Sequence, residues 1–253
     1  MNNFKVSIIT ISYNNVSTIL DTIKSVGSQT YSNIEYIVVD GASNDGTLNI
    51  IKKNQDIISK YISETDEGIY DAMNKGIQLA TGEIVGILNA DDFFYNKNTL
   101  ASVVEAFNKY NVEAIFGDIV FVSDSNHDKV IRYYSAKKWH PDKFVWGYMP
   151  PHPSFFAKSD LYKKFGLFKT DYHIAADYEL LIRFLKVNEV KYKYLPIVTT
   201  KMRMGGASTK NLYSNYLLNK EIIRACKENG LYTNVFMVYS KYIKKIFEFI
   251  VKR

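Results

Sequence analysis

The sequence predicts an α/β fold with a mostly parallel sheet that is buried on both faces. Three runs of β-branched and apolar residues, at 6–12, 34–40 and 83–89, have the composition of strands. Such near-continuous apolar strands are typical of a sheet that helices cover on both sides. Helical patterns with short loops separate the three runs, and this alternation predicts parallel strands.

Apolar residues at helical spacing indicate the helices. One helix begins near Val16 and buries residues such as Ile23, a second follows the turn at 41–46, and a third includes Met73. After about residue 112 the pattern is less regular. There we expect, in chain order, a strand at 113–122, an irregular aromatic segment at 123–155, an amphipathic helix at 177–188, a strand at 190–200 and helical structure from Asn211 onward.

Charge and cysteine content narrow the class of protein. The 253 residues carry a net charge of +6 and one cysteine, Cys226, which excludes an internal disulfide and favours a cytoplasmic location. We expect neither a transmembrane helix, which needs about 20 mostly apolar residues, nor a signal peptide. Positive charge suits nucleic acid, anionic lipid or phosphorylated substrates. No nucleic-acid-binding motif accompanies the basic residues, so we expect no nucleic-acid partner.

Polar side chains follow each of the first three predicted strands. They are Ser12, Tyr13 and Asn14 after the first strand, Asp40 at the end of the second, and Asn89, Asp91 and Asp92 after the third. In open parallel sheets, ligands bind beyond the carboxyl ends of the strands. We therefore expect these groups to converge on one crevice.

The adjacent carboxylates of Asp91 and Asp92 indicate a divalent cation. Two such groups at the end of an apolar strand repel each other and lose hydration, and a helix cap near Thr99 accounts for only one of them. Mg²⁺ and Mn²⁺ bind carboxylates, usually together with substrate phosphates. Asp45, by contrast, belongs to a sequence typical of the turn that opens a helix.

Four sequence blocks carry a family resemblance. They are VSIITISYNN at 6–15, IEYIVVDGASNDGT at 34–47, NKGIQLATGEIVGILNADD at 74–92 and ADYEL at 176–180. In this order and spacing they resemble the bacterial family 2 glycosyltransferases, closely over the first 92 residues and less specifically to about Ser208. The resemblance implies a GT-A fold, which is Rossmann-like, and inverting transfer of a sugar from a nucleotide-sugar.

The resemblance also implies roles for single residues. Tyr13 would pack on the nucleotide base, with a tyrosine in the core as the alternative, and Asp40 would hydrogen-bond the uracil ring. Asp91 would ligate Mn²⁺ or Mg²⁺, and Asp92 would lie behind it or contact the donor sugar. The residues implied to bind the nucleotide-sugar are Ser12, Tyr13, Asn14, Asp40, Asp66, Asn74, Asn89, Ala90, Asp91 and Asp92.

Two positions depart from the family pattern. Asn89 replaces the first acid of the Asp-x-Asp motif, so it brings no charge to a metal, and Met73 stands where an arginine often contacts the nucleotide. The variant segment at 65–76 places Asp66 before a glycine, where we expect it to face the crevice. Asp71 is expected in the first turn of a helix, where the helix dipole favours an acid.

An inverting transfer needs a general base for the acceptor hydroxyl. Asp177 aligns with the catalytic aspartate of the family, although the usual Glu-Asp is Ala-Asp here; a plain helix N-cap is the alternative. His152, between two prolines, is a candidate contact for the acceptor or a phosphate, or a structural histidine. Lys201 and Arg203 precede a Gly-Gly pair, so they belong either to a mobile loop that clamps the diphosphate or to a solvated surface.

The last segment, 235–253, has the pattern of an amphipathic helix. Its final 13 residues carry five cations and one acid. Lys241, Lys244, Lys245 and Lys252 share one face, opposite Val235, Phe236, Tyr239, Ile243, Ile246, Phe247 and Ile250. This pattern favours a helix in the interface of an anionic membrane. An ordinary helix that packs its apolar face on the protein is the alternative.

The sequence therefore predicts a catalytic domain at 1–210 and a helical extension at 211–253. Within the domain, 1–112 would bind the nucleotide-sugar, which we expect to be UDP-linked, and 113–210 would bind the acceptor. Similar bacterial enzymes build surface polysaccharide on polyprenyl-diphosphate-linked acceptors at the cytoplasmic face of the plasma membrane. The alternatives are a nucleotidyltransferase, whose glycine-rich basic loop is missing after the first strand, and a non-catalytic nucleotide- or sugar-binding module.

Overall fold

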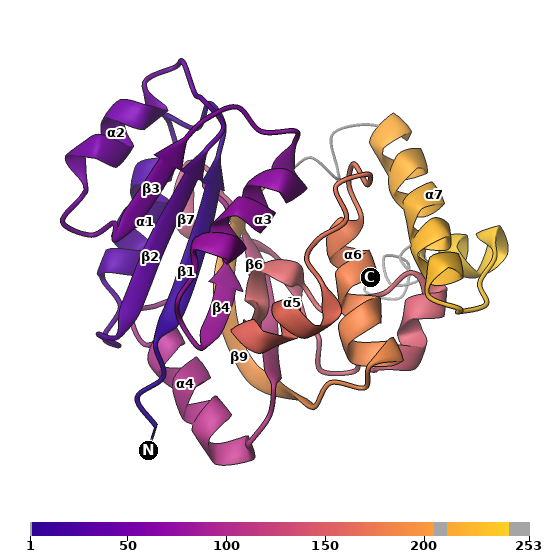
Figure 1. Cartoon of the computed structure of the whole chain (residues 1–253). Helices are drawn as coiled ribbons and strands as arrows, with labels where there is room; N and C mark the ends of the chain where they lie inside the picture. Colours follow the sequence, from indigo (N-terminus) through magenta and orange to yellow (C-terminus); the bar gives the residue numbers. More distant parts are fainter. Residues whose placement is uncertain (1, 205–211, 243–253) are drawn as a thin grey trace.

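A computed structural model describes residues 2–204 and 212–242 of the chain. In these residues nine strands form one sheet in the order β3-β2-β1-β4-β8-β6-β9-β5, with β7 paired to β6 (Figure 1). The strands are β1 (Val6–Ser12), β2 (Ile34–Asp40), β3 (Lys60–Ser63), β4 (Ile84–Ile87), β5 (Asp92–Phe94), β6 (Ala114–Ser123), β7 (Asn126–Tyr134), β8 (Phe155–Lys158) and β9 (Tyr192–Arg203).

The sheet changes character along its length. β3, β2, β1 and β4 are parallel to one another, as predicted. β8 then runs antiparallel to both of its neighbours, β4 and β6. β6 and β9 are parallel, and β5 and β7 add antiparallel strands to them. The predicted α/β fold with a mostly parallel first half is confirmed, and the second half is a mixed sheet.

Helices cover both faces of the sheet (Figure 1). They are α1 (Ile19–Gly27), α2 (Thr47–Lys53), α3 (Ile69–Leu79), α4 (Thr99–Tyr110), α5 (Ser159–Phe165), α6 (Ala176–Ile182) and α7 (Leu212–Glu228), with short helical turns η1 (Pro141–Trp146), η2 (His152–Ser154) and η3 (Arg183–Val187). Alternate residues of β1 enter two cores: Ile8 packs with α1 and α4, and Ile9 packs with α3 and α6. This double burial is why the strands are apolar at almost every position.

Two local predictions need correction. The first helix begins at Ile19 rather than near Val16, because the backbone from Asn15 to Thr18 forms a turn. The segment 123–155 is not wholly irregular, since it contains β7. β7 is exposed along almost its whole length, so it lacks the buried alternation by which strands are recognised in a sequence.

Helix α7 is packed into the same core as α6. Ile222, Ala225 and Cys226 are buried in the cluster that also contains Tyr178 and Leu181 of α6. The start of the predicted C-terminal extension is therefore part of the main body. Within the described ranges, no helix is both long and apolar enough to cross a membrane.

Candidate active site

The carboxyl ends of β1, β2 and β4 meet at one edge of the sheet. Ser12 lies opposite Asp40 in the register of the two parallel strands, and its carbonyl accepts a hydrogen bond from the Gly41 N–H at 2.8 Å. The backbone N–H of Ala90 donates to the Ile11 carbonyl at 3.3 Å. The predicted convergence of the strand ends is therefore confirmed.

The side chains of Tyr13 and Asp66 both lie close to Gly41 at this edge of the sheet. The Tyr13 side chain is 63% exposed, which excludes the alternative of a core tyrosine. A β-carbon added at Gly41 would lie 2.5 Å from Asp66 Oδ2 and 3.4 Å from Tyr13 Cδ2, so both side chains lie close to the Gly41 backbone. An exposed aromatic ring beside a carboxylate is a suitable place for a base, because the ring can stack and the carboxylate can accept hydrogen bonds.

Asp40 is buried under the loop that follows β2. Its carboxylate accepts hydrogen bonds from the Ser43 N–H at 3.1 Å, the Ser43 hydroxyl and the Ser63 hydroxyl at 2.6 Å. Asn14 holds the same loop from the other side, since its Oδ1 accepts the Asn44 N–H at 3.0 Å. The structure gives Asp40 a part in shaping the loop, and its contact with uracil stays a prediction.

Asn74, a predicted nucleotide contact, and Met73, at the position where the family often has an arginine, both contact other parts of the protein. The Asn74 amide donates to the Phe168 carbonyl and accepts the Phe168 N–H, both at 2.9 Å, so it fastens α3 to that segment. Met73 is buried in the core. Asp71 lies in the first turn of α3 and accepts the Glu67 N–H at 3.1 Å, as expected for an acid at a helix N-terminus.

The pair Asp91–Asp92 lies where β4 gives way to β5. Asp92 is buried, its Oδ2 accepts a long 3.5 Å hydrogen bond from Asn89, and its Oδ1 has no partner among the described residues. Asn89 Oδ1 is likewise buried without one. Burial, and next the neighbouring Asp91 charge, raise the pKa of Asp92 well above its usual range. Burial also raises the pKa of Asp91.

These oxygens fit a divalent cation. In the described part of the chain, no group of three or more histidine, cysteine, aspartate or glutamate side chains is placed to hold a metal. Mg²⁺ and Mn²⁺, however, are usually bound by one or two carboxylates together with substrate phosphates. Asp91 is the more accessible carboxylate, and Asn89 and Asp92 each have one buried oxygen without a partner among the described residues.

Arg203 holds the backbone of this site rather than reaching out from a loop. It lies in β9, donates to the Asp91 carbonyl at 3.0 Å and pairs with Asp21. Its side chain is 9% exposed. Lys201, in the same strand, pairs with Asp128 at 3.2 Å. Both residues lie in a paired strand rather than in the expected mobile loop, and their contact with the diphosphate stays a prediction.

Asp177 occupies the first turn of α6 and is half-buried. Its Oδ1 accepts the N–H of the next residue, Tyr178, at 2.8 Å, and no side-chain cap is formed, so it is not the N-cap of the helix. Burial raises the pKa of Asp177 to about 6. A carboxylate of this pKa is a much better proton acceptor near neutral pH than an ordinary one.

Two further residues position Asp177. Glu221, from α7, accepts the backbone N–H groups of His173 at 2.8 Å and of Ile174 and Ala175 at 2.9 Å. Tyr70, from α3, donates to the Ile174 carbonyl and lies 3.5 Å from Asp177 Oδ1. Neither role could be predicted from the sequence, because Tyr70 and Glu221 both lie more than 40 positions from the residues that they hold.

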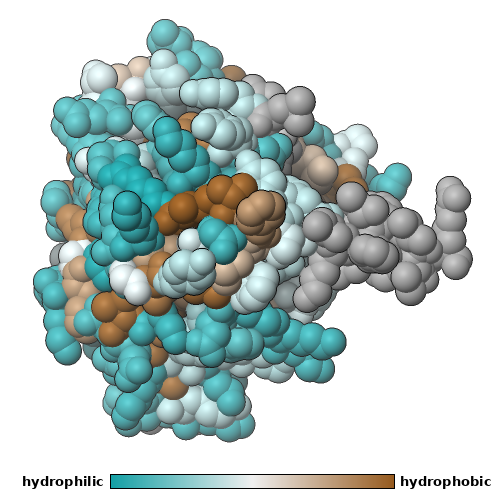
Figure 2. All heavy atoms as spheres, turned by 90° about the vertical axis from the view of Figure 1, so that its right-hand side faces the viewer, coloured by the Kyte–Doolittle hydropathy of each residue, from teal (hydrophilic) through white to brown (hydrophobic). Residues whose placement is uncertain are grey.

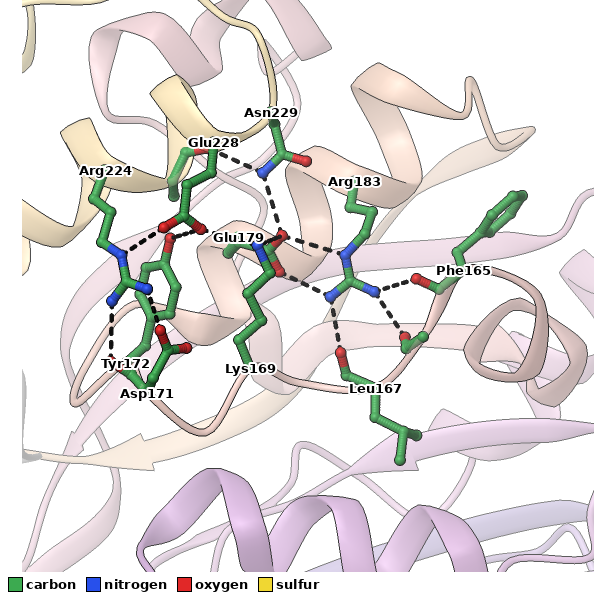
Figure 3. A network of polar contacts seen from close by, with 12 residues as sticks. Phe165, Leu167, Lys169, Asp171, Tyr172, Glu179, Arg183, Arg224, Glu228 and Asn229 are labelled. Carbon is green, nitrogen blue, oxygen red and sulfur yellow. Dashed lines mark hydrogen bonds and ion pairs between the residues drawn. The ribbon is translucent and has the colours of Figure 1, made fainter.

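A polar network under α6 ties this region together (Figure 3). Glu179 is fully buried and pairs with Arg183 at 2.8 Å and Lys169 at 3.2 Å. Burial alone would raise the pKa of Glu179, but the Arg183 hydrogen bond and charge outweigh it and lower the pKa. Glu228 of α7 also pairs with Lys169, at 2.9 Å, so the network joins α6 to α7.

His152 is buried rather than exposed on a loop. Its ring packs edge-on against Phe168 at 5.6 Å, and burial lowers the pKa of the imidazole to about 4. A neutral, buried ring cannot pair with a phosphate charge at neutral pH. This burial favours the structural alternative for His152, and its contact with the acceptor stays a prediction.

Comparison with known proteins now identifies the family. The family model described as glycosyl transferase family 2 matches residues 7–173. The chain belongs to this family. A glycosyltransferase of Mycobacterium tuberculosis, itself uncharacterized, is 35% identical over 189 residues, which are 73% of this chain and 70% of the relative. A PGL/p-HBAD biosynthesis glycosyltransferase of Mycobacterium bovis is 27% identical and covers 83% of the chain and 79% of its own length. The protein is thus a glycosyltransferase, as the resemblance implied.

Solved structures show the same fold. TarS 1–349 of S. aureus, in complex with UDP-GlcNAc, has a TM-score of 0.69 at 19% identity and covers 87% of this chain. The mannosyltransferase PcManGT of Pyrobaculum calidifontis, in complex with GDP-Man and Mn²⁺, has a TM-score of 0.68 at 22% identity and covers 90%. This chain spans 66% and 64% of those two proteins. The GT-A fold is confirmed.

Proposed function

We propose that this family 2 glycosyltransferase is metal-dependent and inverting, and that it transfers a sugar from a nucleotide-sugar, UDP-linked by preference, to a saccharide acceptor. The observation that carries the proposal is Asp177, a half-buried carboxylate with its pKa raised to about 6. The partly exposed Tyr13 ring and the Asp91 carboxylate at the strand ends support the donor side.

The residues of the chain have separate parts in the proposed reaction. Asp177 accepts the proton of the acceptor hydroxyl as that oxygen attacks the anomeric carbon. Asp91 would hold a divalent ion, which when bound neutralises charge on the departing diphosphate. Arg203 fixes the Asp91 backbone, and Glu221 fixes the segment before Asp177. One attack by the acceptor on the face opposite the leaving group inverts the anomeric carbon.

The metal assignment is tested by transfer rates in Mg²⁺ or Mn²⁺ and in excess chelator. Asp91→Ala should lose several kcal/mol of transition-state stabilisation while the fold survives. Asp56→Ala, at an exposed position, is the matched control. Full activity of Asp91→Ala, or of the unchanged protein in chelator, would contradict metal dependence. A nucleotidyltransferase remains the weaker alternative, since residues 13–18 after β1 contain neither glycine nor a basic residue.

We also propose that the enzyme acts peripherally at the cytoplasmic face of the bacterial plasma membrane, on a polyprenyl-diphosphate-linked acceptor in surface polysaccharide synthesis of the O-antigen or capsule type. Residues 235–242 are helical. On this helix Val238 is buried, whereas Val235 is 56% and Phe236 88% exposed. Figure 2 shows the face that carries α7, with apolar side chains gathered near its centre. The basic positions Lys244, Lys245 and Lys252 lie outside the described residues.

This exposure supports the interfacial helix over a helix that packs its apolar face on the protein. Sedimentation with vesicles of phosphatidylglycerol tests it. Phe236→Ser should release the protein from the vesicles, and added salt should weaken the binding, because salt screens the attraction between basic residues and anionic lipid. The control Val130→Ser, at an exposed apolar position on β7, should leave vesicle binding unchanged. Absence of vesicle binding at low salt would reject the membrane proposal and leave the glycosyltransferase activity unaffected.

A further inference from the structure

An open pocket of about 800 Å³ lies between α7 and residues 171–174. One face of α7 forms its wall: Tyr213, Leu217, Lys220 and Arg224 follow one another at helical spacing, three or four residues apart. His173 and Ile174 line the opposite side. No residue to which a donor role has been given lines this pocket.

The pocket lining carries two cations and two carboxylates, and one of the cations, Lys220, has no partner of opposite charge among the described residues. The Arg224 guanidinium pairs with Asp171 and, at 2.6 Å, with Glu228, as Figure 3 shows. The Glu221 carboxylate accepts its three backbone hydrogen bonds. Lys220 is exposed, and no hydrogen bond or ion pair joins its ammonium group to another residue of the described ranges. An anionic group is therefore the complementary ligand.

The uncharged part of the pocket suits a sugar ring. Tyr213 is 70% exposed, and Leu217 and Ile174 are half-buried beside it. An exposed aromatic ring next to aliphatic side chains offers a flat apolar surface that can cover the C–H face of a sugar. A free phosphate ion has no apolar surface that could pack against these side chains.

The pocket also adjoins the base. Ile174 lines it, the Ile174 carbonyl accepts the Tyr70 hydroxyl, and Asp177 follows only three residues later. The Ile174 and Ala175 N–H groups are those that Glu221 holds. An acceptor with its hydroxyl at Asp177 would thus have its next unit close to this pocket.

We propose that this pocket is an acceptor subsite for a saccharide that carries an anionic group, a phosphate or a carboxylate, beyond the hydroxyl that is glycosylated. The inference rests on the proposed function and names the class of acceptor. Lys220 receives the anion, Tyr213 covers the neighbouring ring, and the contact lies against the segment that positions Asp177.

The test uses the full chain, saturated with UDP and Mg²⁺ so that the donor site is filled. Glucose 1-phosphate is added, and NMR follows the backbone amides of His173, Ile174 and Ala175. We expect saturable displacement of these signals. Lys220→Ala should weaken binding by about tenfold or more, the usual effect of losing one charge-assisted hydrogen bond. The control Lys227→Ala removes the same charge from the same helix outside the pocket, and it should leave the affinity for glucose 1-phosphate unchanged.

The arms of the test separate the sources of an anion. Glucose, which has no charge, and glycerol 1-phosphate, which copies a lipid headgroup without a sugar, should both bind more weakly than glucose 1-phosphate. Equal binding of glycerol 1-phosphate would overturn the saccharide assignment, and equal loss in Lys227→Ala would overturn the role of Lys220. Unmoved His173–Ala175 signals in a protein that still hydrolyses its donor would reject the subsite alone. A protein without any hydrolysis would reject the proposed function instead.

Discussion

Asp177→Asn should have opposite effects on activity and on stability. Asparagine keeps the shape of the side chain, and its Oδ1 can still accept the Tyr178 N–H that Asp177 accepts at 2.8 Å. It cannot take a proton from the acceptor. Because general-base catalysis contributes about 10²–10⁴-fold, transfer should fall by that factor while donor binding is kept.

The stability effect follows from the pKa. Burial raises the pKa of Asp177 from an ordinary 3.8 to about 6. A group whose pKa is raised on folding destabilises the fold when it is ionised, and one pKa unit corresponds to about 1.4 kcal/mol. The cost is absent below pH 3.8 and complete above about pH 6. Asp177→Asn should therefore gain up to about 3 kcal/mol of unfolding free energy at pH 8 and almost nothing at pH 4.

Urea unfolding at the two pH values, with transfer rates measured on the same preparations, provides the assay. Asp160→Asn is the control, because Asp160 holds the matching first-turn position of α5 and is 85% exposed. Its stability and activity should hardly change. An Asp177→Asn variant that is active, or that is less stable at pH 8 than the unchanged protein, would refute the assignment of Asp177 as a base whose pKa is raised by burial.

Three further predictions use other parts of the site. Because burial raises the pKa of Asp92, binding of Mg²⁺ should release protons, and the affinity for Mg²⁺ should rise with pH. Calorimetry in buffers of different ionisation enthalpy measures the released protons. An Mg²⁺ affinity that does not depend on pH would contradict the prediction. Glu179→Gln should lower the free energy of unfolding in urea by about 3–5 kcal/mol, since it leaves the charge of Arg183, whose side chain is 15% exposed, without its buried carboxylate partner. A change below about 1 kcal/mol would mean that the pair behaves as an exposed one. Tyr13→Ala should weaken UDP binding by about 1–3 kcal/mol without loss of stability, and unchanged UDP affinity would remove Tyr13 from the base site.

The first half of the fold was predictable because its strands are buried on both faces. β1 and β2 begin and end at the predicted residues, and the polar strand ends meet as parallel pairing requires. β5, of three residues, and the exposed β7 have no such pattern and could not be predicted.

The place of a candidate residue was predictable where it lies at its own strand end or helix turn, as Asp91 and Asp177 do. It was not predictable where a distant partner decides the role. Arg203 bonds Asp91 and Asp21, which lie 112 and 182 positions away in the chain. These two contacts hold in place a cation that was expected in a loop. The pKa of Asp177 likewise depends on burial, which only the packing of α3 and α7 around α6 creates.

The most direct measurement is proton NMR of donor hydrolysis with Mg²⁺ and a panel of α-linked nucleotide-sugars. Water then stands in for the acceptor, and the configuration of the released sugar is recorded before it equilibrates. Inverting catalysis through Asp177 predicts that one donor of the panel yields the β-sugar, and that Asp177→Asn yields far less. Release of the α-sugar, or equal hydrolysis by the Asn variant, would contradict single displacement with Asp177 as the base.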